Sequence, residues 1–477
     1  FTNPTTGASV EFTAAHNIYI DENGIAYIFG ASSNTGSSPA DGAIFLDVNA
    51  NPTNPVYLGE WDDEYIHDGM ARGDTMYAGC INAGELFVVD VSNKSNPQTL
   101  GSQTTPNAFT HNAWVSDNGD FVFTTDEQSD AYIAAYDITN VNNIQEVDRI
   151  QSNPGSNTIP HNTHVDGNFL ITSYYRDGTT VHDITYPNNM IEVGYYDSYP
   201  GSGSGFDGNW GTYPFLPSGN IISSDINSGA NQSAKLLIYE RQFQQACYLE
   251  GTVTDANTSN AIASASVEIL STSINTNTNI TGDYTSGIAN VGIYNILFSK
   301  PGYISDTISA VLSNGVMTTV NVQLVPLPSF TGNGIVTDIT GNGIANAQVL
   351  IYNNDFTFTL TTDVNGNFNV ANMYDGNYEV IAGQWGYNTI CSNENITTTN
   401  NNLTIVLPEG YYDDFTFDFG WTISGGITLS DPGRWERGDP EGTSQQGLDY
   451  NPENDISSDC YEFAYITGLD AGGQVGS

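Results

Sequence analysis

Four histidines stand at matching places in a segment that is repeated through the first half of the sequence. The four copies read HNIYIDENGIAYIFG, HDGMARGDTMYAG, HNAWVSDNGDFVFTT and HNTHVDGNFLITS. Their first residues are His16, His67, His111 and His161. Neutral imidazole is a common protein ligand for divalent transition metals. Four equivalent imidazoles therefore predict a metal site, provided that the fold brings the repeats around one axis.

Each copy has the pattern of a β-hairpin with a Gly-containing turn. Between the copies lies a strand that ends in Asp, a polar loop and another strand, and these Asp residues recur every 43 to 47 residues. They are Asp47, Asp90, Asp137 and Asp183. Four strands in about 40 to 45 residues are typical of one β-propeller blade, whose innermost strand lines a central channel. The histidines then begin the innermost strands of four successive blades. A fifth blade has Gly211 at this position, so the ring of histidines is predicted to be incomplete.

Two interpretations of the histidines are open. In the first they bind a divalent transition metal in the channel. In the second each one caps its strand by bonding the backbone of a neighbouring blade, because no carboxylate or cysteine at a fixed spacing completes a ligand set. His164 and His182 fall at sheet-packing positions and are predicted to be structural. The recurring Asp residues are predicted to bond the backbone of the turns that follow them.

The motifs THNAWVSDNGDFVFTTDE and PHNTHVDGNFLITSYYRDGTTVHDIT resemble the choice-of-anchor B family, the LVIVD-repeat propellers of secreted bacterial proteins. The resemblance implies a propeller and an extracellular location, and it brings no established reaction. We assign the propeller to residues 1–244. The pattern begins inside a blade, so this domain is expected to be N-terminally incomplete, with about two blades missing from a larger ring. A closed five-bladed ring, in which residues 5–13 form the outer strand of the last blade, is the alternative.

After residue 244 the pattern changes to two copies of a smaller unit. GTVTDANTSNAIASASVEI parallels GNGIVTDITGNGIANAQVLI, and the alternating strands predict two small β-sandwiches at 245–327 and 328–408. Both resemble carboxypeptidase regulatory-like domains, prealbumin-like sandwiches that serve as spacers in secreted proteins; the name implies no peptidase activity. Asp363, Asn365 and Asn367 have the spacing of a calcium loop. Without a Glu at the twelfth position a hairpin turn is favoured over calcium.

The last segment, 409–477, contains GRWERGDPEGTSQQGLDYNPENDISSDCYEFAYITG. It resembles the start of a MAM or concanavalin-like jelly roll from proteins exported by the type IX system of Bacteroidetes. The segment is shorter than a full jelly roll, so a truncated domain is expected. Trp435, Arg437 and Asp439 are the candidate residues for binding glycans or calcium, against a structural role in sheet-edge packing and a salt bridge.

Composition limits the partners. Nine Lys and Arg residues against 54 Asp and Glu residues give a formal charge of -45, which repels nucleic-acid backbones and anionic lipids. No stretch approaches 18 apolar residues, so no membrane span is predicted, and the absence of a signal peptide suggests a processed or fragmentary exported protein. The four cysteines form no CxxC pair, and a Cys247–Cys391 disulfide is considered for an oxidising compartment.

The sequence therefore predicts an all-β, secreted or cell-surface protein for adhesion or for assembly of a surface structure. Its expected partners are cell-surface glycans, other surface proteins, or further copies in a homo-oligomer or appendage. There is no GxSxG, HExxH or P-loop motif, which favours a protein without catalytic activity. The alternative is a secreted metal-dependent enzyme, an oxidase or hydrolase, that uses the histidine cluster in the channel.

Overall fold

The computed structural model describes residues 1–2, 7, 9–34, 39–201, 203–226, 234–411, 413–422, 435–440, 442–445, 448–451 and 460–467. This part of the chain is built from β-strands and one 3-10 helix, Val141–Asn143. It contains no helix with the length and apolar character needed to cross a membrane. The chain forms two compact units. The first comprises Phe1–Thr254, Asn260–Phe298 and Asp306–Gln323, and the second Asp255–Ser259, Ser299–Ser305 and Leu324–Ser477.

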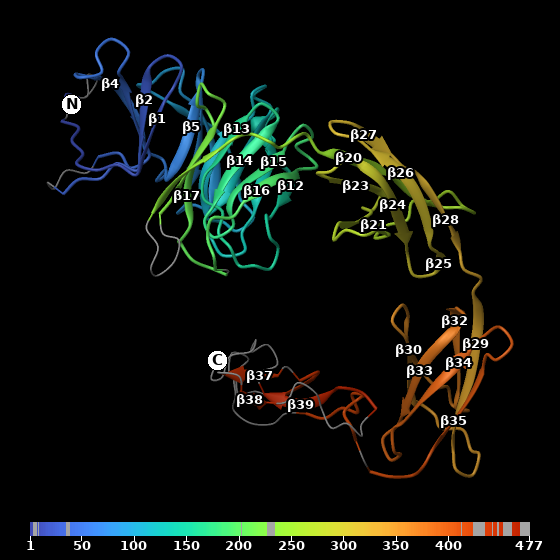
Figure 1. Ribbon diagram of the computed structural model, residues 1–477. Coiled ribbons are helices and arrows are strands. Elements are labelled where there is room, and N and C mark those ends of the chain that lie inside the picture. The colour runs from blue at the N-terminus through green and yellow to red at the C-terminus, as the bar shows by residue number, and fades with distance from the viewer. Residues whose placement is uncertain are drawn as a thin grey trace. The chain divides into compact units, whose positions relative to one another are not determined.

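The first unit opens with five consecutive antiparallel meanders, and in the described residues four have four strands and the fifth has three (Figure 1). Their strands are β1 (Asn17–Ile20), β2 (Ile25–Phe29), β3 (Ala43–Asp47), β4 (Val56–Trp61), β5 (Asp68–Arg72), β6 (Thr75–Cys80), β7 (Glu85–Asp90), β8 (Gln98–Thr104), β9 (Thr110–Val115), β10 (Phe121–Asp126), β11 (Ile133–Asp137), β12 (Gln145–Ile150), β13 (Thr163–Asp166), β14 (Phe169–Tyr174), β15 (Gly178–Asp183), β16 (Ile191–Tyr196), β17 (Asn209–Tyr213), β18 (Ile221–Asp225) and β19 (Lys235–Tyr239). Within each meander every strand pairs with the next along the chain.

Hydrophobic cores lie between the faces of consecutive meanders. Between the first and second, Tyr27 and Phe45 pack with Met76 and Val89. Corresponding clusters join the second meander to the third, the third to the fourth and the fourth to the fifth. The strands therefore bury both faces, which explains why so many of them are apolar at successive positions.

The recurring Asp residues end the third strands of the first four meanders, and their role is confirmed. Each carboxylate accepts a hydrogen bond from the backbone N–H two residues later, at 2.8–2.9 Å. Just before each Asp, the register between the third and fourth strands shifts by one residue. The repeat seen in the sequence is thus a repeat of backbone geometry as well.

The closed five-bladed alternative is wrong in its choice of outer strand. Val10 is buried against the first meander, and Ala14 forms an isolated bridge with Ser32 beside it. The described part of 5–13 therefore covers the first meander. Within the described residues, β19 is the outermost strand of the fifth meander.

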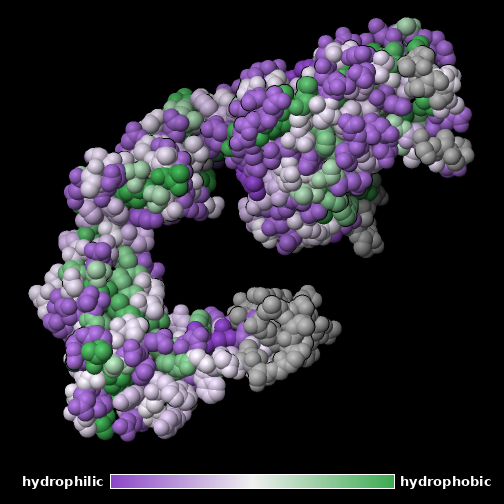
Figure 2. Space-filling view, turned by 180° about the vertical axis from the view of Figure 1, so that it is seen from behind, coloured by the Kyte–Doolittle hydropathy of each residue, from purple (hydrophilic) through white to green (hydrophobic). Residues whose placement is uncertain are grey.

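Two β-sandwiches follow the meanders. In the first, one sheet has the order β23-β20-β28-β25 with β27 beside β20, and the other has the order β22-β21-β24-β26. Tyr284 and Phe298 meet between these sheets, with ring centroids 5.6 Å apart. In the second sandwich, sheets β32-β29-β35 and β31-β30-β33-β34 share a core that includes Val336, Ile351 and Tyr378. The two predicted sandwich folds are confirmed. On the face shown in Figure 2, hydrophilic and hydrophobic residues are mixed over both sandwiches.

The strands of the sandwiches are β20 (Cys247–Asp255), β21 (Ser266–Ile269), β22 (Asn275–Asn277), β23 (Asp283–Ile288), β24 (Gly292–Ser299), β25 (Tyr303–Ile304), β26 (Asp306–Leu312), β27 (Met317–Thr319), β28 (Val322–Pro326), β29 (Phe330–Asp338), β30 (Gln348–Tyr352), β31 (Thr357–Thr361), β32 (Asn367–Met373), β33 (Gly376–Gly383), β34 (Ile390–Ile396) and β35 (Asn402–Leu407). Beyond them, β36 (Trp435–Gly438) pairs with β39 (Ala464–Thr467), and β37 (Thr443–Gln445) pairs with β38 (Leu448–Asn451).

A disulfide joins Cys391 of β34 to Cys460, with a sequence separation of 69 residues. Cys247 is a free, buried cysteine, so the Cys247–Cys391 pairing considered from the sequence is wrong. Cys80 is also free and buried. The actual bond ties the segment that contains β36 to β39 onto the second sandwich.

We expect the Cys391–Cys460 bond to stabilise this part of the chain. Closing a loop of this length restricts the unfolded chain, so replacing Cys391 with Ser should lower the free energy of unfolding by about 2 to 4 kcal/mol. Urea denaturation with and without dithiothreitol measures the effect. Reductant should weaken the wild-type protein and leave Cys391→Ser unchanged; equal sensitivity of the two proteins would contradict the pairing.

Candidate metal centre

The four predicted histidines sit at β-bulges where the first strands of four meanders begin. The backbone N–H of His16 donates to the carbonyl of Phe29 at 2.9 Å, although the register partner of Phe29 is the next residue, Asn17. His16 and Asn17 of the first strand therefore both lie opposite Phe29 of the second strand. The same arrangement recurs at His67, His111 and His161. A bulge redirects the side chain of the extra residue. The repeated bulge is what turns the four imidazoles toward one another.

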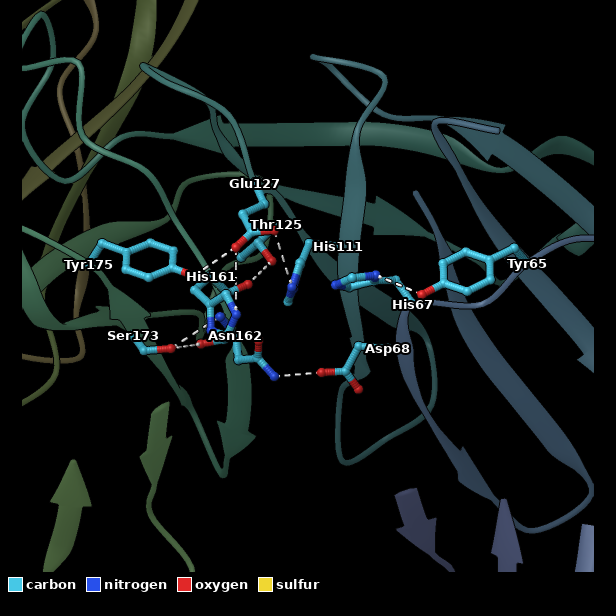
Figure 3. A network of polar contacts seen from close by, with 10 residues as sticks. All are labelled: Tyr65, His67, Asp68, His111, Thr125, Glu127, His161, Asn162, Ser173 and Tyr175. Atoms are coloured by element: carbon cyan, nitrogen blue, oxygen red, sulfur yellow. Dashed lines mark hydrogen bonds and ion pairs between the residues drawn. The ribbon is translucent and has the colours of Figure 1, made fainter. Parts of the chain in front are cut away.

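The imidazole rings form a continuous row. Ring centroids are 3.6 Å apart for His16 and His67, 4.4 Å for His67 and His111, and 4.3 Å for His111 and His161. His16 is exposed, whereas His111 and His161 are 1% and 5% exposed. The row therefore runs from the surface into the interior, and Figure 3 shows three of its members with their polar neighbours.

Glu127 completes the cluster, and the sequence analysis missed it. Its carboxylate oxygens lie 3.5 Å from Nε2 of His111 and 3.7 Å from Nε2 of His161 (Figure 3). The hydroxyl of Tyr175 donates to the same carboxylate at 2.7 Å. Glu127 and Tyr175 occupy equivalent places just past the second strands of the third and fourth meanders. An acidic residue directly after the second strand was the only sequence feature that could have revealed Glu127. This feature occurs in one repeat only.

The fifth meander has Trp210 at the histidine position, and the assignment of Gly211 is wrong by one residue. Trp210 is the residue skipped between Asn209 and Gly211 in the pairing with β18, as His111 is skipped in the pairing with β10. Its ring centroid lies 5.4 Å from that of His161. The count failed because the turn glycine of this hairpin sits one residue later in its loop.

Burial keeps the imidazoles neutral. It lowers the pKa of His67 to about 4 and that of His161 to about 3, and it holds the pKa of His111 well below its usual value. The neighbouring imidazoles lower these pKa values further, because adjacent positive charges repel. Burial also raises the pKa of Glu127. At neutral pH the cluster therefore offers uncharged nitrogen lone pairs, the form of His that binds metals.

A second polar layer follows the histidines by one residue. Its members are Asn17, Asp68, Asn112 and Asn162. The Asp68 carboxylate accepts from Nδ2 of Asn162 at 2.5 Å and from the backbone N–H of Gly69 at 2.6 Å. Burial raises the pKa of Asp68 to about 6, opposed by these bonds and by side-chain bonds from Asn112 and Asn17.

A cavity of about 660 Å³ adjoins this second layer. Residues on or just beside the first strands of all five meanders line it, among them Tyr19, Arg72, Trp114, His164 and Tyr213. The cavity therefore lies on the axis that the five first strands share.

The two remaining histidines lie outside the row. His182 is fully buried in β15, which confirms its prediction as a packing residue. His164 packs between the rings of Trp114 and Phe215, with centroid distances of 4.5 and 5.8 Å. Neither belongs to a group of ligand atoms that could share an ion in the described part of the chain.

The other predicted site residues lie far from the histidines in sequence and outside the sheets that carry the histidines. Trp435 is 52% exposed, and Arg437 donates to the carbonyl of Phe415 at 2.9 Å. Asp439 is exposed just after β36. The Asp363 carboxylate accepts from the backbone N–H groups of Asn365 and Asn367 at 2.8 Å, which is the hairpin turn favoured by the sequence.

Comparison with known proteins identifies part of the chain. Residues 248–325 and 333–408 match the carboxypeptidase regulatory-like domain, which confirms that part of the resemblance. No curated protein sequence matches the chain. The choice-of-anchor B and jelly-roll resemblances stay predictions.

Solved structures give weaker likenesses. A streptococcal ancillary pilin is 12% identical with a TM-score of 0.26, covering 49% of this chain and 81% of the pilin. The shaft pilin of Lactobacillus rhamnosus GG is 11% identical with a TM-score of 0.23, covering 35% of this chain and 99% of the pilin. Hydrazine synthase of Kuenenia stuttgartiensis is 12% identical with a TM-score of 0.34, covering 80% of each chain. No functional inference rests on scores this low.

We expect His164 to make the fold sensitive to acid. Burial lowers its pKa to about 4, whereas an unfolded histidine titrates near 6.5. Below about pH 6.5 the unfolded chain takes up a proton that the folded chain does not, so stability falls as the pH drops toward 4. Between pH 7 and pH 5, wild type should lose about 1 to 2 kcal/mol more stability than His164→Phe in urea denaturation. Equal losses would contradict this assignment.

Proposed function

We propose that this chain is an extracellular modular surface protein whose N-terminal meanders bind a divalent transition metal ion. The observation that carries the proposal is the cluster of four imidazoles and the Glu127 carboxylate, gathered from separate meanders into one site. Metal-ligating sites of this kind combine neutral imidazole with carboxylate and leave a coordination position open. In the alternative role each histidine caps a strand, and the bonds of His111 to the backbone of His161 and of His161 to the backbone of Trp210 fit that role. Capping does not account for the Glu127 carboxylate that faces both imidazoles. The Nδ1 atoms of His111 and His161 are buried without a hydrogen-bond partner in the described residues.

The distances support coordination over hydrogen bonding. Nε2 atoms 3.5 and 3.7 Å from the Glu127 carboxylate are beyond the usual hydrogen-bond range. Two ligands of one tetrahedral ion, each about 2.1 Å from the metal, are about 3.4 Å apart. The side chains thus face one another at nearly the separation that a shared ion requires.

The remaining features support a modular protein outside the cell. The matched carboxypeptidase regulatory-like domains are rigid sandwiches that suit the role of spacers. The Cys391–Cys460 disulfide fits an oxidising compartment, and the strongly acidic composition disfavours nucleic acid as a partner. In this proposal the meanders are part of a propeller of the choice-of-anchor B type. The segment 409–477 begins a jelly roll, and the partners are surface glycans, surface proteins or further copies of the chain.

A metal-dependent enzyme is the second candidate, and the cavity beside the cluster favours it. Asp68 lines this cavity and follows directly on His67, so a bound ligand would lie near the metal. Metal ions with an open position activate water or polarise a substrate. Hydrolase or oxidase activity that disappears in His67→Ala would favour this candidate over a purely binding role.

We expect the purified full-length chain to bind at least one Zn²⁺ after chelation and dialysis. Replacing both His67 and His111 with Ala removes the shared centre of the row and should abolish binding. His182→Gln, which changes a histidine outside the row, is the matched control and should bind like wild type. Zinc content by mass spectrometry, with folding checked by circular dichroism, measures the result. A zinc-free wild type would refute the proposal.

We expect Trp435 to contribute to glycan binding. An exposed aromatic ring can stack on a sugar, so Trp435→Ala should weaken binding on a glycan array about tenfold or more. Trp385, equally exposed at 52% but located in the second sandwich, is the control. Binding that survives Trp435→Ala, or that is lost equally in Trp385→Ala, would exclude this role for Trp435.

A further inference from the structure

The ligand atoms of the cluster fall into two overlapping groups of three. His16, His67 and His111 form one group, and His111, Glu127 and His161 form the other, with all ligand atoms inside each group within 4.8 Å of one another. In the described residues no group joins His16 or His67 with Glu127 or His161, so the two ends of the row belong to different sets of ligand atoms. One ion therefore cannot use all five side chains.

We infer that the site binds two divalent transition metal ions, one in each group, with the imidazole of His111 between them. This inference rests on the proposed metal binding and specifies its stoichiometry and its ligands. The ion in the first group would have three histidine ligands. The ion in the second would have two histidines and a carboxylate. Each set is a known type of three-ligand site, and each leaves a fourth position for water or substrate.

His111 has the arrangement that a bridging ligand needs. Its Nε2 faces Glu127 at 3.5 Å, in the second group. Its Nδ1 is buried and has no hydrogen-bond partner in the described residues, and we assign this atom to the first group. An imidazole can bind two metal ions only after losing its ring proton. Binding of the second ion therefore converts neutral His111 to imidazolate and releases one proton to solvent.

A tyrosine orients one ligand in each group. The hydroxyl of Tyr65 lies 3.2 Å from Nδ1 of His67, which leaves Nε2 of His67 for a metal. The hydroxyl of Tyr175 holds Glu127 at 2.7 Å. Partners of this kind fix the orientation of ligating side chains. Tyr65 and Tyr175 are thus positioning residues, one for each group.

Negative charges around the cluster favour the binding of two neighbouring metal ions. The imidazolate of His111 and the carboxylate of Glu127 each contribute a negative charge within the cluster. Asp68, directly after His67, adds a buried carboxyl group close by. These negative charges reduce the repulsion between two dications held a few ångströms apart.

The test is the number of metal ions bound per full-length chain. Wild-type protein equilibrated with excess Zn²⁺ and then desalted should contain two ions. Glu127→Gln, a nearly isosteric change, and His16→Ala should each contain one, and His182→Gln should contain two. One ion in wild type overturns this inference and leaves the proposed metal binding intact. A wild type without zinc overturns both.

Copper tests the bridge by a magnetic measurement. Two Cu²⁺ ions joined by an imidazolate couple magnetically, so the electron paramagnetic resonance signal of wild type should be far smaller than two isolated Cu²⁺ ions give. His16→Ala, with one ion, should show the full signal of one uncoupled Cu²⁺. Two bound Cu²⁺ ions with an uncoupled signal would overturn the bridging role of His111.

Discussion

The β-bulge at the start of the first strands is the constraint on which the histidine cluster depends. In a regular strand successive side chains point to opposite faces. At each bulge the histidine and the residue after it oppose the same partner, so the usual alternation is interrupted. Two polar layers result, one of imidazoles and one of Asn17, Asp68, Asn112 and Asn162. The same backbone irregularity, repeated from meander to meander, builds both.

Repetition decided which parts of this arrangement could be predicted from the sequence. The equivalence of the four histidines and the turn-bonding Asp residues follow from the repeat, because equal positions in equal units acquire equal geometry. Glu127 was missed because the other repeats carry no carboxylate at its place. Trp210 was missed because the turn glycine of its hairpin sits one residue later in the loop than in the first and third meanders. A residue that differs from its counterparts in the other repeats cannot be recognised by periodicity in a single sequence.

In the second half of the chain, too, repeated features were predictable from the sequence and unique contacts were not. Alternating strands in two parallel copies predicted two sandwiches, and each has its own packed core. The disulfide partner of Cys391 was not predictable, because bonding requires Cα atoms within about 7 Å and sequence separation does not report that distance. Cys460 lies beyond the second copy, where no repeat gives a frame for locating it. Local patterns specify strands, whereas long-range contacts depend on the assembled fold.

The histidine row also has an energetic consequence. Burying a polar nitrogen without a partner costs about 1 to 3 kcal/mol, and the Nδ1 atoms of His111 and His161 are both in that state. Natural proteins have a total stability of only about 5 to 15 kcal/mol, so two such atoms in one site are a substantial loss. A ligand that binds only the folded state offsets this loss through its binding free energy. In the proposed two-ion site Nδ1 of His111 would gain a metal as its partner, and the binding free energy of the ions would offset the rest of the loss. If the proposed ions bind, the buried Nδ1 of His111 that weakens the metal-free fold is also one of their ligands.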